Sequence, residues 1–555
     1  MRKSALIRVC SVFIICILFA LQVSYGTVTA PNENEYEYAF ALVDITELSI
    51  TDLQNAVDEG KLTYKQIMCL YMDRVKAYGD MYNCLISISD TALQEAEKCD
   101  EIYKKRGRSS MIFGLPVIVK DNIDVKGMLT TNGSNSYLNN KASEDAEIIA
   151  NIKKAGGIIL AKANMDKFAN HSQYSKSDFG TVNNAFDLKR TSYGSSGGSA
   201  VAAAASLAPI CIGTDTNASI RVPASANGIV GFRPTKETVS TDGITPCMPE
   251  RDVAGPMAQS VKDAAIIYSV MTGNDKEYPQ ILKSYDLKGK KIGIITALTY
   301  CSKEFNEIFE NAVGQLEKAG ADVVPISISP AADWKDDVAS YRRYFTAAME
   351  KCGVDVAIYP TIRSSVMDHK TASYSGGNSN GWLVAPSAAA PAISVPMGMD
   401  KDGMPVGLEF VGKPFDDEKV LCAAYAFEQM MNLDIKTDLA PTLYEIPQSI
   451  VELTEFAKKP VIKPFDKFTD GYEEVLNAYD KAAALPETEY YLSRASISEA
   501  EKLMANYEVA VSEYTEAYKV WKKSVIVGIA AIVSVIIGMA ATVVIHVKRR
   551  NNRII

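Results

Sequence analysis

Apolar positions follow two different periods along the middle of the chain. From about residue 43 they recur at helical spacing, as at Leu53 and Val57 and again at Ile67 and Leu70. Short aliphatic and β-branched runs indicate strands at 115–119, 158–160, 292–295, 323–326, 356–359 and 392–395. Because helices and strands alternate in this way up to about residue 433, the pattern predicts an α/β domain with a mixed or parallel central sheet flanked by helices.

The run 200–208 consists mainly of alanine and predicts a compact helix directly after the Gly/Ser-rich residues 194–199. Small side chains allow a helix to lie close against its neighbours. A tight turn that leads into a buried helix is therefore expected here.

Both ends of the chain carry apolar segments. Residues 1–26 have a charged start, a short apolar centre and small residues at the exit, which predicts a secretory signal peptide, with an uncleaved anchor as the alternative. The polar residues 27–42 follow as a leader. Residues 524–547 are long and apolar enough to span a bilayer, and the basic tail 548–555 places the C-terminus inside. We therefore expect a single-pass protein of the cell membrane whose main domain is extracellular.

Between the main domain and the predicted span, the periodic pattern is first lost and then returns. Residues 434–465 carry four prolines among charges, which indicates a linker. Residues 466–523 follow as a helical stalk, in which Leu503, Tyr507 and Tyr514 form a helical stripe. This stripe is expected to pack within a helical hairpin, and a partner-binding face is the alternative.

Composition narrows the possible partners. The formal net charge is −9, so no basic surface for nucleic acid is expected. Ten cysteines become eight once Cys10 and Cys16 are removed with the signal peptide. The remaining eight show no CxxC and no Cys/His spacing typical of metal sites, so we expect no metal and no other cofactor. Disulfide pairing and oligomeric state stay open.

Two serines and a lysine stand in unusual local sequences. Ser219 lies in Gly-Thr-Asp-Thr-Asn-Ala-Ser-Ile-Arg, Ser195 lies in Gly-Ser-Ser-Gly-Gly-Ser, and Lys120 ends an apolar strand. Outside the two ends of the chain, the histidines are His171 and His369, for which surface or hydrogen-bonding roles are expected. Without a Gly-x-Ser-x-Gly elbow, an ordinary serine-hydrolase triad is not expected.

A lysine can replace histidine as the proton acceptor when it is neutral. Burial disfavours the ammonium form and lowers its pKa, and the end of an apolar strand is a plausible place for such burial. Each residue also has an ordinary alternative: Lys120 as a solvated strand-end lysine, Ser195 in a flexible or phosphate-binding loop, and Ser219 as a loop serine. No Gly-Lys-Ser/Thr follows 194–199, which excludes a Walker loop.

Several motifs in one order resemble the amidase-signature hydrolases, and the resemblance covers roughly residues 43–431 within the domain 43–433. The matching segments are 114–124, 194–199, 213–221, 228–235, 255–257, 391–396 and 405–408. The resemblance implies the amidase-signature fold and hydrolysis of carboxylic amide bonds in small-molecule or peptide substrates.

The resemblance also implies roles for single residues. Ser219 matches the nucleophile, Ser195 the cis-peptide serine that relays the proton, and Lys120 the general base. The backbone N–H groups of Thr216, Asn217, Ala218 and Ser219 would form the oxyanion hole. Ser196 would hydrogen-bond within the relay, while Asp215 and Arg221 would brace the loop.

The chain departs from the family pattern directly before Ser219. Most members of the family have two glycines there, whereas this chain has Asn217 and Ala218. Glycine permits a positive φ, which alanine adopts only with strain. The departure therefore indicates an unusual substrate, a weak activity, or a turn that never needed glycine.

Three functions are compatible with the sequence. The first is a surface amidase with an acyl-enzyme on Ser219, and the second is a non-catalytic amidase-like binding module on a stalk. A third is the glutaminase subunit of a transfer-RNA amidotransferase, which the predicted export of the chain disfavours because its partners are cytosolic.

Overall fold

The computed structural model describes residues 44–273, 278–282, 285–330, 337–372 and 378–443. Within these, Ile45–Pro441 form one compact unit. The predicted signal peptide, leader, helical stalk, membrane span and tail lie outside the described residues. No helix in the described ranges combines the length and the apolar character needed to cross a bilayer.

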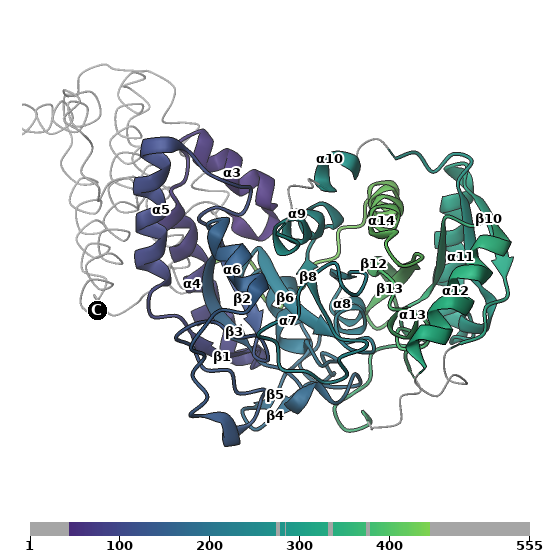
Figure 1. Cartoon of the computed structure of the whole chain (residues 1–555), viewed down its shortest axis with the longest axis horizontal. Helices are drawn as coiled ribbons and strands as arrows, with labels where there is room; N and C mark the ends of the chain where they lie inside the picture. The colour runs from purple at the N-terminus through teal and green to yellow at the C-terminus, as the bar shows by residue number, and fades with distance from the viewer. Residues whose placement is uncertain (1–43, 274–277, 283–284, 331–336, 373–377, 444–555) are drawn as a thin grey trace, which may run out of the picture. The chain divides into compact units, whose positions relative to one another are not determined.

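A mixed sheet of eleven strands runs through the described unit (Figure 1). In spatial order the strands are β1 (Leu85–Ile88), β3 (Ile158–Ala163), β2 (Pro116–Lys120), β6 (Ile210–Asp215), β8 (Val253–Ala258), β7 (Val230–Arg233), β12 (Ala392–Met399), β13 (Pro405–Val411), β11 (Val356–Pro360), β9 (Lys291–Ile295) and β10 (Asp322–Ile326). Strands β3, β2 and β6 are parallel, as are β11, β9 and β10. The other neighbours pair antiparallel, so the predicted mixed sheet is confirmed.

Helices pack around this sheet. Their bounds are α3 (Ile50–Asp58), α4 (Tyr64–Tyr82), α5 (Ala92–Arg106), α6 (Glu147–Lys154), α7 (Gly197–Ala204), α8 (Arg221–Ala226), α9 (Val261–Met271), α10 (Tyr278–Leu282), α11 (Lys303–Lys318), α12 (Val338–Cys352), α13 (Ala385–Ala388) and α14 (Asp417–Met431). A small hairpin joins β4 (Lys176–Ser177) to β5 (Gly180–Thr181). Capping boxes begin α3 and α4, at Ser49 and Thr63, and satisfy the free N–H groups of their first turns.

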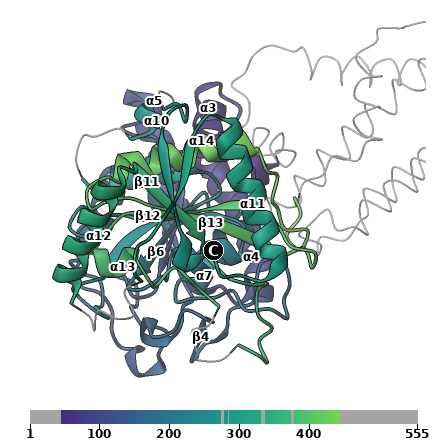
Figure 2. The ribbon, with the colours of Figure 1, turned by 90° about the vertical axis from the view of Figure 1, so that its right-hand side faces the viewer.

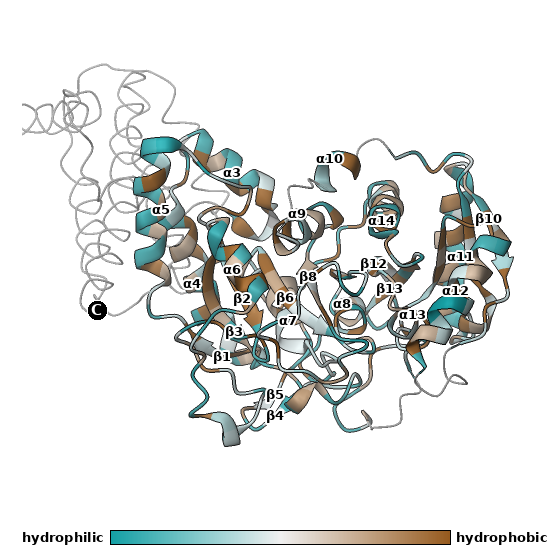
Figure 3. Ribbon diagram, viewed as in Figure 1, coloured by the Kyte–Doolittle hydropathy of each residue, from teal (hydrophilic) through white to brown (hydrophobic). Residues whose placement is uncertain are grey.

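Hydrophobic residues concentrate on the central strands (Figure 3), and every residue of β2, β3, β6 and β8 is buried. Such strands read as continuous apolar runs because both of their faces are covered. In the other half of the sheet, Figure 2 shows α12 and α11 on either side of β11 to β13. There α12 buries Tyr341, Phe345 and Met349 in a core shared with β11.

Two details differ from the sequence-based picture. The small-residue helix α7 is buried as expected, but it begins at Gly197 and ends at Ala204, and Ser206 then takes a left-handed φ of 53°. Residues 434–441, at the start of the predicted linker, belong to the compact unit, where Arg74 donates to the carbonyls of Ala440 and Pro441.

Candidate active site

The three segments singled out by the sequence meet at one edge of the sheet. Strands β2 and β6 are parallel neighbours, and they end at Lys120 and Asp215 respectively. The carboxyl ends of parallel strands lie at the same edge, where α/β proteins place their ligands. Helix α7 packs on both strands, so the turn 193–196 before it reaches the same edge.

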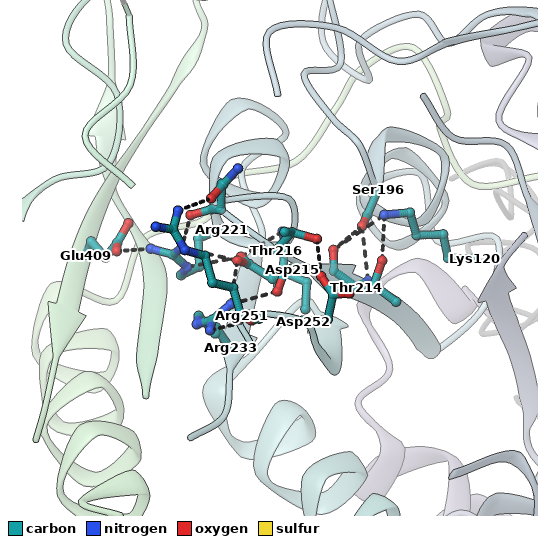
Figure 4. Close-up of polar contacts among 12 residues, drawn as sticks. Lys120, Ser196, Thr214, Asp215, Thr216, Arg221, Arg233, Arg251, Asp252 and Glu409 are labelled. Carbon is teal, nitrogen blue, oxygen red and sulfur yellow. Dashed lines mark hydrogen bonds and ion pairs between the residues drawn. The ribbon is translucent and has the colours of Figure 1, made fainter. Parts of the chain in front are cut away.

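Lys120 is fully buried among neutral oxygen atoms (Figure 4). Its Nζ lies 2.7 Å from Ser195 Oγ, 2.8 Å from Thr214 Oγ1 and 3.4 Å from Thr214 O. Burial lowers the pKa of Lys120 to about 7, and the charge of Asp215 opposes that effect only in part. The amine therefore titrates near neutral pH, which suits a general base.

The turn that holds Ser195 is built by close packing. The Gly194–Ser195 peptide bond is cis, as the resemblance implied. A Cβ on Gly194 would lie 2.3 Å from Tyr174 O, so only glycine fits there. The backbone carbonyl of Ser195 accepts hydrogen bonds from Asp166 N (3.0 Å) and Ser175 Oγ (3.3 Å). These contacts fix the buried Ser195 hydroxyl beside Lys120.

Ser196 connects the turn to the loop after β6. Its hydroxyl donates to Thr214 O at 3.0 Å and accepts from Thr214 N at 3.2 Å. Its backbone N–H donates to Ser219 O at 3.2 Å. Ser196 therefore hydrogen-bonds to the backbone of Thr214 and Ser219, and both bonds of its hydroxyl are made with Thr214.

Ser219 lies in the loop between β6 and α8 and is 5% exposed. Its hydroxyl makes no hydrogen bond to another residue of the described ranges. The structure thus brings Lys120 and Ser195 into contact and ties the Ser219 backbone to Ser196, but it shows no bond between the two serine hydroxyls. Catalytic hydrogen bonds are often long before substrate binds and tighten in the complex.

The loop before Ser219 offers free donors. The backbone N–H groups of residues 216–219 donate to no other group in the part of the chain that the structure describes. Buried N–H groups without a partner are rare in folded proteins. Four successive free donors, the last of them on Ser219 itself, are suited to holding an oxyanion.

The residues that replace the expected glycines fit this loop without strain. Neither Asn217 nor Ala218 is among the residues with positive φ, so the turn does not need glycine for its backbone conformation. The Ala218 side chain is buried, and its Cβ lies 3.0 Å from the position that a Cβ on Gly381 would take. Because Gly381 has no side chain, it leaves room for the Ala218 methyl group.

A charged cluster, formed by Asp215, Arg221, Arg233 and Glu409, lies behind the loop (Figure 4). All four side chains are fully buried. Arg221 contacts Glu409 Oε1, lies 3.1 Å from Asp215 Oδ2 through Nε, and donates from Nη2 to Asn217 O at 2.8 Å. Burial raises the pKa of Asp215, but the charges of Arg221 and Arg233 outweigh it and hold that pKa below its usual value. The cluster braces the loop, as the resemblance implied for Asp215 and Arg221.

Sequence reasoning missed the contacts on the other side of the loop. Thr216 Oγ1 donates to Asp252 Oδ1 at 2.6 Å, and Arg251 Nη1 donates to Asn217 Oδ1 at 3.1 Å. Arg251 and Asp252 directly precede β8, which pairs antiparallel with β6 through Val253 and Asp215. The sequence places both residues just before the 255–257 motif. Only the pairing of β8 with β6, however, shows that they lie beside the loop that carries Ser219.

Sequence reasoning also missed Thr214, whose hydroxyl accepts from Lys120 and from Asn122 Nδ2. His171 binds Asp166 Oδ2 through Nδ1 at 2.8 Å, which confirms the hydrogen-bonding role expected for it. In the described ranges, no group of three His, Cys, Asp or Glu side chains is placed to hold a metal ion. The contact between Lys120 and Ser195, together with the free N–H groups before Ser219, is suited to acyl transfer.

Comparisons with known proteins show the family to which the chain belongs. The amidase family model matches residues 66–340 and 331–421. The A subunit of glutamyl-tRNA(Gln) amidotransferase from Clostridium botulinum strain Okra is 30% identical over 478 residues, which cover 70% of this chain and 98% of that protein. The same subunit from Caldanaerobacter subterraneus is 29% identical over 483 residues, covering 71% and 98%.

Solved structures show the same fold. Native peptide amidase from Stenotrophomonas maltophilia is 27% identical, with a TM-score of 0.64, and the match covers 71% of this chain and 99% of that one. An amidase family protein from Bacillus anthracis is 26% identical, with a TM-score of 0.63 and coverages of 75% and 97%. The amidase-signature fold predicted from the motifs is thus confirmed. The chain therefore belongs to the amidase family and is a hydrolase of carbon–nitrogen bonds in amides.

Proposed function

We propose that the chain hydrolyses linear carboxylic amides, including peptide amides, through an acyl-enzyme on Ser219. The observation that carries this proposal is the buried Lys120 amine, which lies 2.7 Å from Ser195 Oγ and has a pKa lowered to about 7. An uncharged amine beside a serine hydroxyl, one loop away from a second serine, supplies a nucleophile and a proton path without histidine.

In the first half of the reaction, Ser219 Oγ attacks the amide carbonyl. Its proton passes to Ser195 as Ser195 gives its own proton to Lys120. The carbonyl oxygen becomes an oxyanion that the free N–H groups of residues 216–219 stabilise. When the C–N bond breaks, Lys120 returns a proton through Ser195 to the leaving nitrogen, which departs as ammonia or an amine. An ester on Ser219 remains.

In the second half, water attacks the ester along the same path. Lys120 and Ser195 take the proton from water, and the oxyanion again occupies the same donors. Collapse of the intermediate releases the carboxylic acid and returns the proton to Ser219. The cycle needs no cofactor, because every proton transfer is between water, substrate and these three side chains.

The alternative is a non-catalytic binding module. Asn217 and Ala218 were the reason to consider it, yet both fit the loop with ordinary φ values. The pKa of Lys120, lowered toward neutrality beside the Ser195 hydroxyl, also has no evident purpose in a binding module. These observations favour the catalytic function.

A test uses the full-length chain, purified in detergent, with a serine-directed fluorophosphonate and a panel of amides. Ser219→Ala is expected to lower kcat/KM by at least about 10⁴-fold and to abolish labelling, because no other group replaces the nucleophile. Ser225→Ala is a matched control, since Ser225 is a buried serine on α8 whose hydroxyl has no partner in the described ranges. Hydrolysis that survives Ser219→Ala unchanged would overturn the proposal.

The curated relatives favour a second candidate, in which the chain acts as the A subunit of a glutamyl-tRNA amidotransferase. The predicted signal peptide argues against it, because it directs the chain away from the cytosol. The amide panel therefore includes free glutamine. Hydrolysis of glutamine without hydrolysis of peptide amides would favour this second candidate.

The predicted signal peptide and membrane span support a location at the cell surface, with the amidase domain outside. Protease added to intact cells should then degrade the amidase domain and spare a tag placed after residue 555. Protection of the amidase domain in intact cells, with cleavage after lysis, would contradict this location.

A further inference from the structure

Asn217 differs from its neighbours in the loop before Ser219. Residues 214–216 and 218–221 are all buried, whereas Asn217 is partly exposed. Its side chain therefore reaches the accessible side of a loop whose other side chains face the protein. It also stands two residues before the proposed nucleophile, where any substrate must approach.

The orientation of the Asn217 amide is fixed by Arg251. Arg251 Nη1 lies 3.1 Å from Asn217 Oδ1. Because a guanidinium only donates, the atom that faces it is the amide oxygen, which settles the orientation of the side chain. Arg251 is itself 9% exposed, and its backbone is held by Met248 O and by Arg233 Nη2, each at 2.8 Å.

The other end of the amide is a pair of unused donors. Asn217 O accepts from Arg221 Nη2 at 2.8 Å and Oδ1 accepts from Arg251, but Nδ2 has no partner in the described part of the chain. Because Oδ1 already accepts from Arg251, the group that the side chain offers to a ligand is the Nδ2 amide nitrogen with its two N–H donors. The matching ligand group is a carbonyl or carboxylate oxygen.

We propose that Asn217 is a specificity-determining residue whose Nδ2 donates a hydrogen bond to a second carbonyl of the substrate, next to the scissile amide. This inference rests on the proposed function of Ser219. It assigns the substrate class as amides that carry such a carbonyl, namely peptide amides and N-acylated amino-acid amides, in preference to simple alkyl amides. The positive charge of Arg251 polarises the Asn217 amide and strengthens its N–H groups as donors.

The test compares two substrates of nearly equal shape. N-acetylalaninamide has the second carbonyl, and 2,4-dimethylpentanamide replaces its N–H with a methylene and its carbonyl oxygen with a methyl group. The measured quantity is the ratio of kcat/KM for the first amide to that for the second. A general loss of activity lowers both values and leaves this ratio unchanged.

Two substitutions separate recognition from loop structure. Asn217→Asp keeps an oxygen for Arg251 and replaces the donor with an acceptor, while Asn217→Gly removes the side chain. Both are expected to lower the ratio by about ten-fold, which corresponds to about 1.4 kcal/mol. Asn306→Asp, on the distant helix α11, is the control and should leave the ratio unchanged.

The same comparison is made by calorimetric binding to Ser219→Ala protein, with and without each Asn217 substitution, so that an inactive variant still gives a result. A binding preference for N-acetylalaninamide that disappears in both variants supports the inference. An equal loss for both amides, a preference that persists, or no preference in the unsubstituted protein overturns it. Absence of hydrolysis by the wild-type chain, with the binding preference intact, would contradict the proposed function instead.

Discussion

Two kinds of buried basic side chain lie next to one another in this protein, and their surroundings differ: one faces neutral oxygen atoms and the other faces carboxylates. Lys120 is surrounded by the neutral oxygens of Ser195 and Thr214. Arg221 is paired directly with the carboxylates of Asp215 and Glu409. Thr214 and Asp215 are the last two residues of β6, and successive strand residues point to opposite faces, so one strand end serves both environments (Figure 4).

The difference teaches what each basic residue can do. At Lys120, burial outweighs the attraction of the more distant carboxylates, and its pKa falls to about 7. At Asp215, the neighbouring arginines outweigh burial, and its pKa lies below the usual value. An arginine keeps its charge at any physiological pH, whereas a desolvated lysine can release its proton. The charged cluster therefore holds the loop, and Lys120 is left to exchange protons.

The largest expected effect comes from removing the lysine. Lys120→Met should lower kcat/KM for an amide by about 10³- to 10⁴-fold, because the proton path then ends at Ser195. The free energy of unfolding at pH 7 should not fall, because no buried counter-ion loses its partner and methionine removes the cost of burying an amine that is charged in the unfolded chain. Steady-state kinetics and urea unfolding of the same preparation measure both quantities.

Lys162 provides a matched control for that substitution. It is equally buried, but its Nζ lies 3.4 Å from Asp121 Oδ1. Lys162→Met should therefore destabilise the protein more than Lys120→Met and reduce the activity of the folded fraction less. If Lys120→Met kept activity within about ten-fold of wild type, the role of general base would have to be abandoned.

The next effect, on stability, comes from breaking the charged cluster. Arg221→Met should lower the free energy of unfolding by about 3–5 kcal/mol, because it leaves the buried carboxylates of Asp215 and Glu409 without their shared cation. Denaturant midpoints measure this change. Lys303→Met, which breaks the exposed pair with Glu307, is the control and should have little effect. An Arg221→Met protein as stable as the control would mean that the cluster does not brace the loop.

Much of the fold was predictable because it follows local patterns. The apolar runs located β2, β3 and β9 to β12, since aliphatic and β-branched residues fill most positions of these strands. The edge strand β1 (Leu85–Ile88) was not predicted, as four residues with one exposed position give too short a signal. The start of α7 was placed three residues late because the glycines of the preceding turn already belong to the helix.

The candidate site divides in the same way. Lys120, Ser195 and Ser219 each stand within a short continuous motif, so the family resemblance could name all three as candidates from the sequence. Glu409 lies 188 positions from Arg221, and no local pattern links the two before the sheet order is known. The sequence also could not predict that Asn217 and Ala218 avoid a positive φ. Residue type indicates which backbone conformations are allowed, and it does not indicate which one is adopted.

The smallest expected effect is a gradual change of kcat/KM with pH, which depends on the protonation of Lys120. Its pKa of about 7 in the folded protein lies below the 10.5 that is usual for a lysine in water. As a base it acts when unprotonated, so kcat/KM should rise about ten-fold per unit of pH below 7 and level off above it. A profile that stays flat between pH 6 and 8 would show that another group limits the reaction.

The same pKa difference predicts a pH-dependent stability. Between pH 7 and 10.5 the unfolded chain holds a proton on Lys120 that the folded protein has released, so the unfolded state binds more protons. Stability contributed by this residue must therefore increase with pH across that window. Lys120→Met should remove this part of the slope in urea unfolding measured from pH 7 to 10, whereas Arg221→Met should keep it. An unchanged slope in Lys120→Met would mean that the buried amine stays charged, and the contrast with the arginines would then disappear.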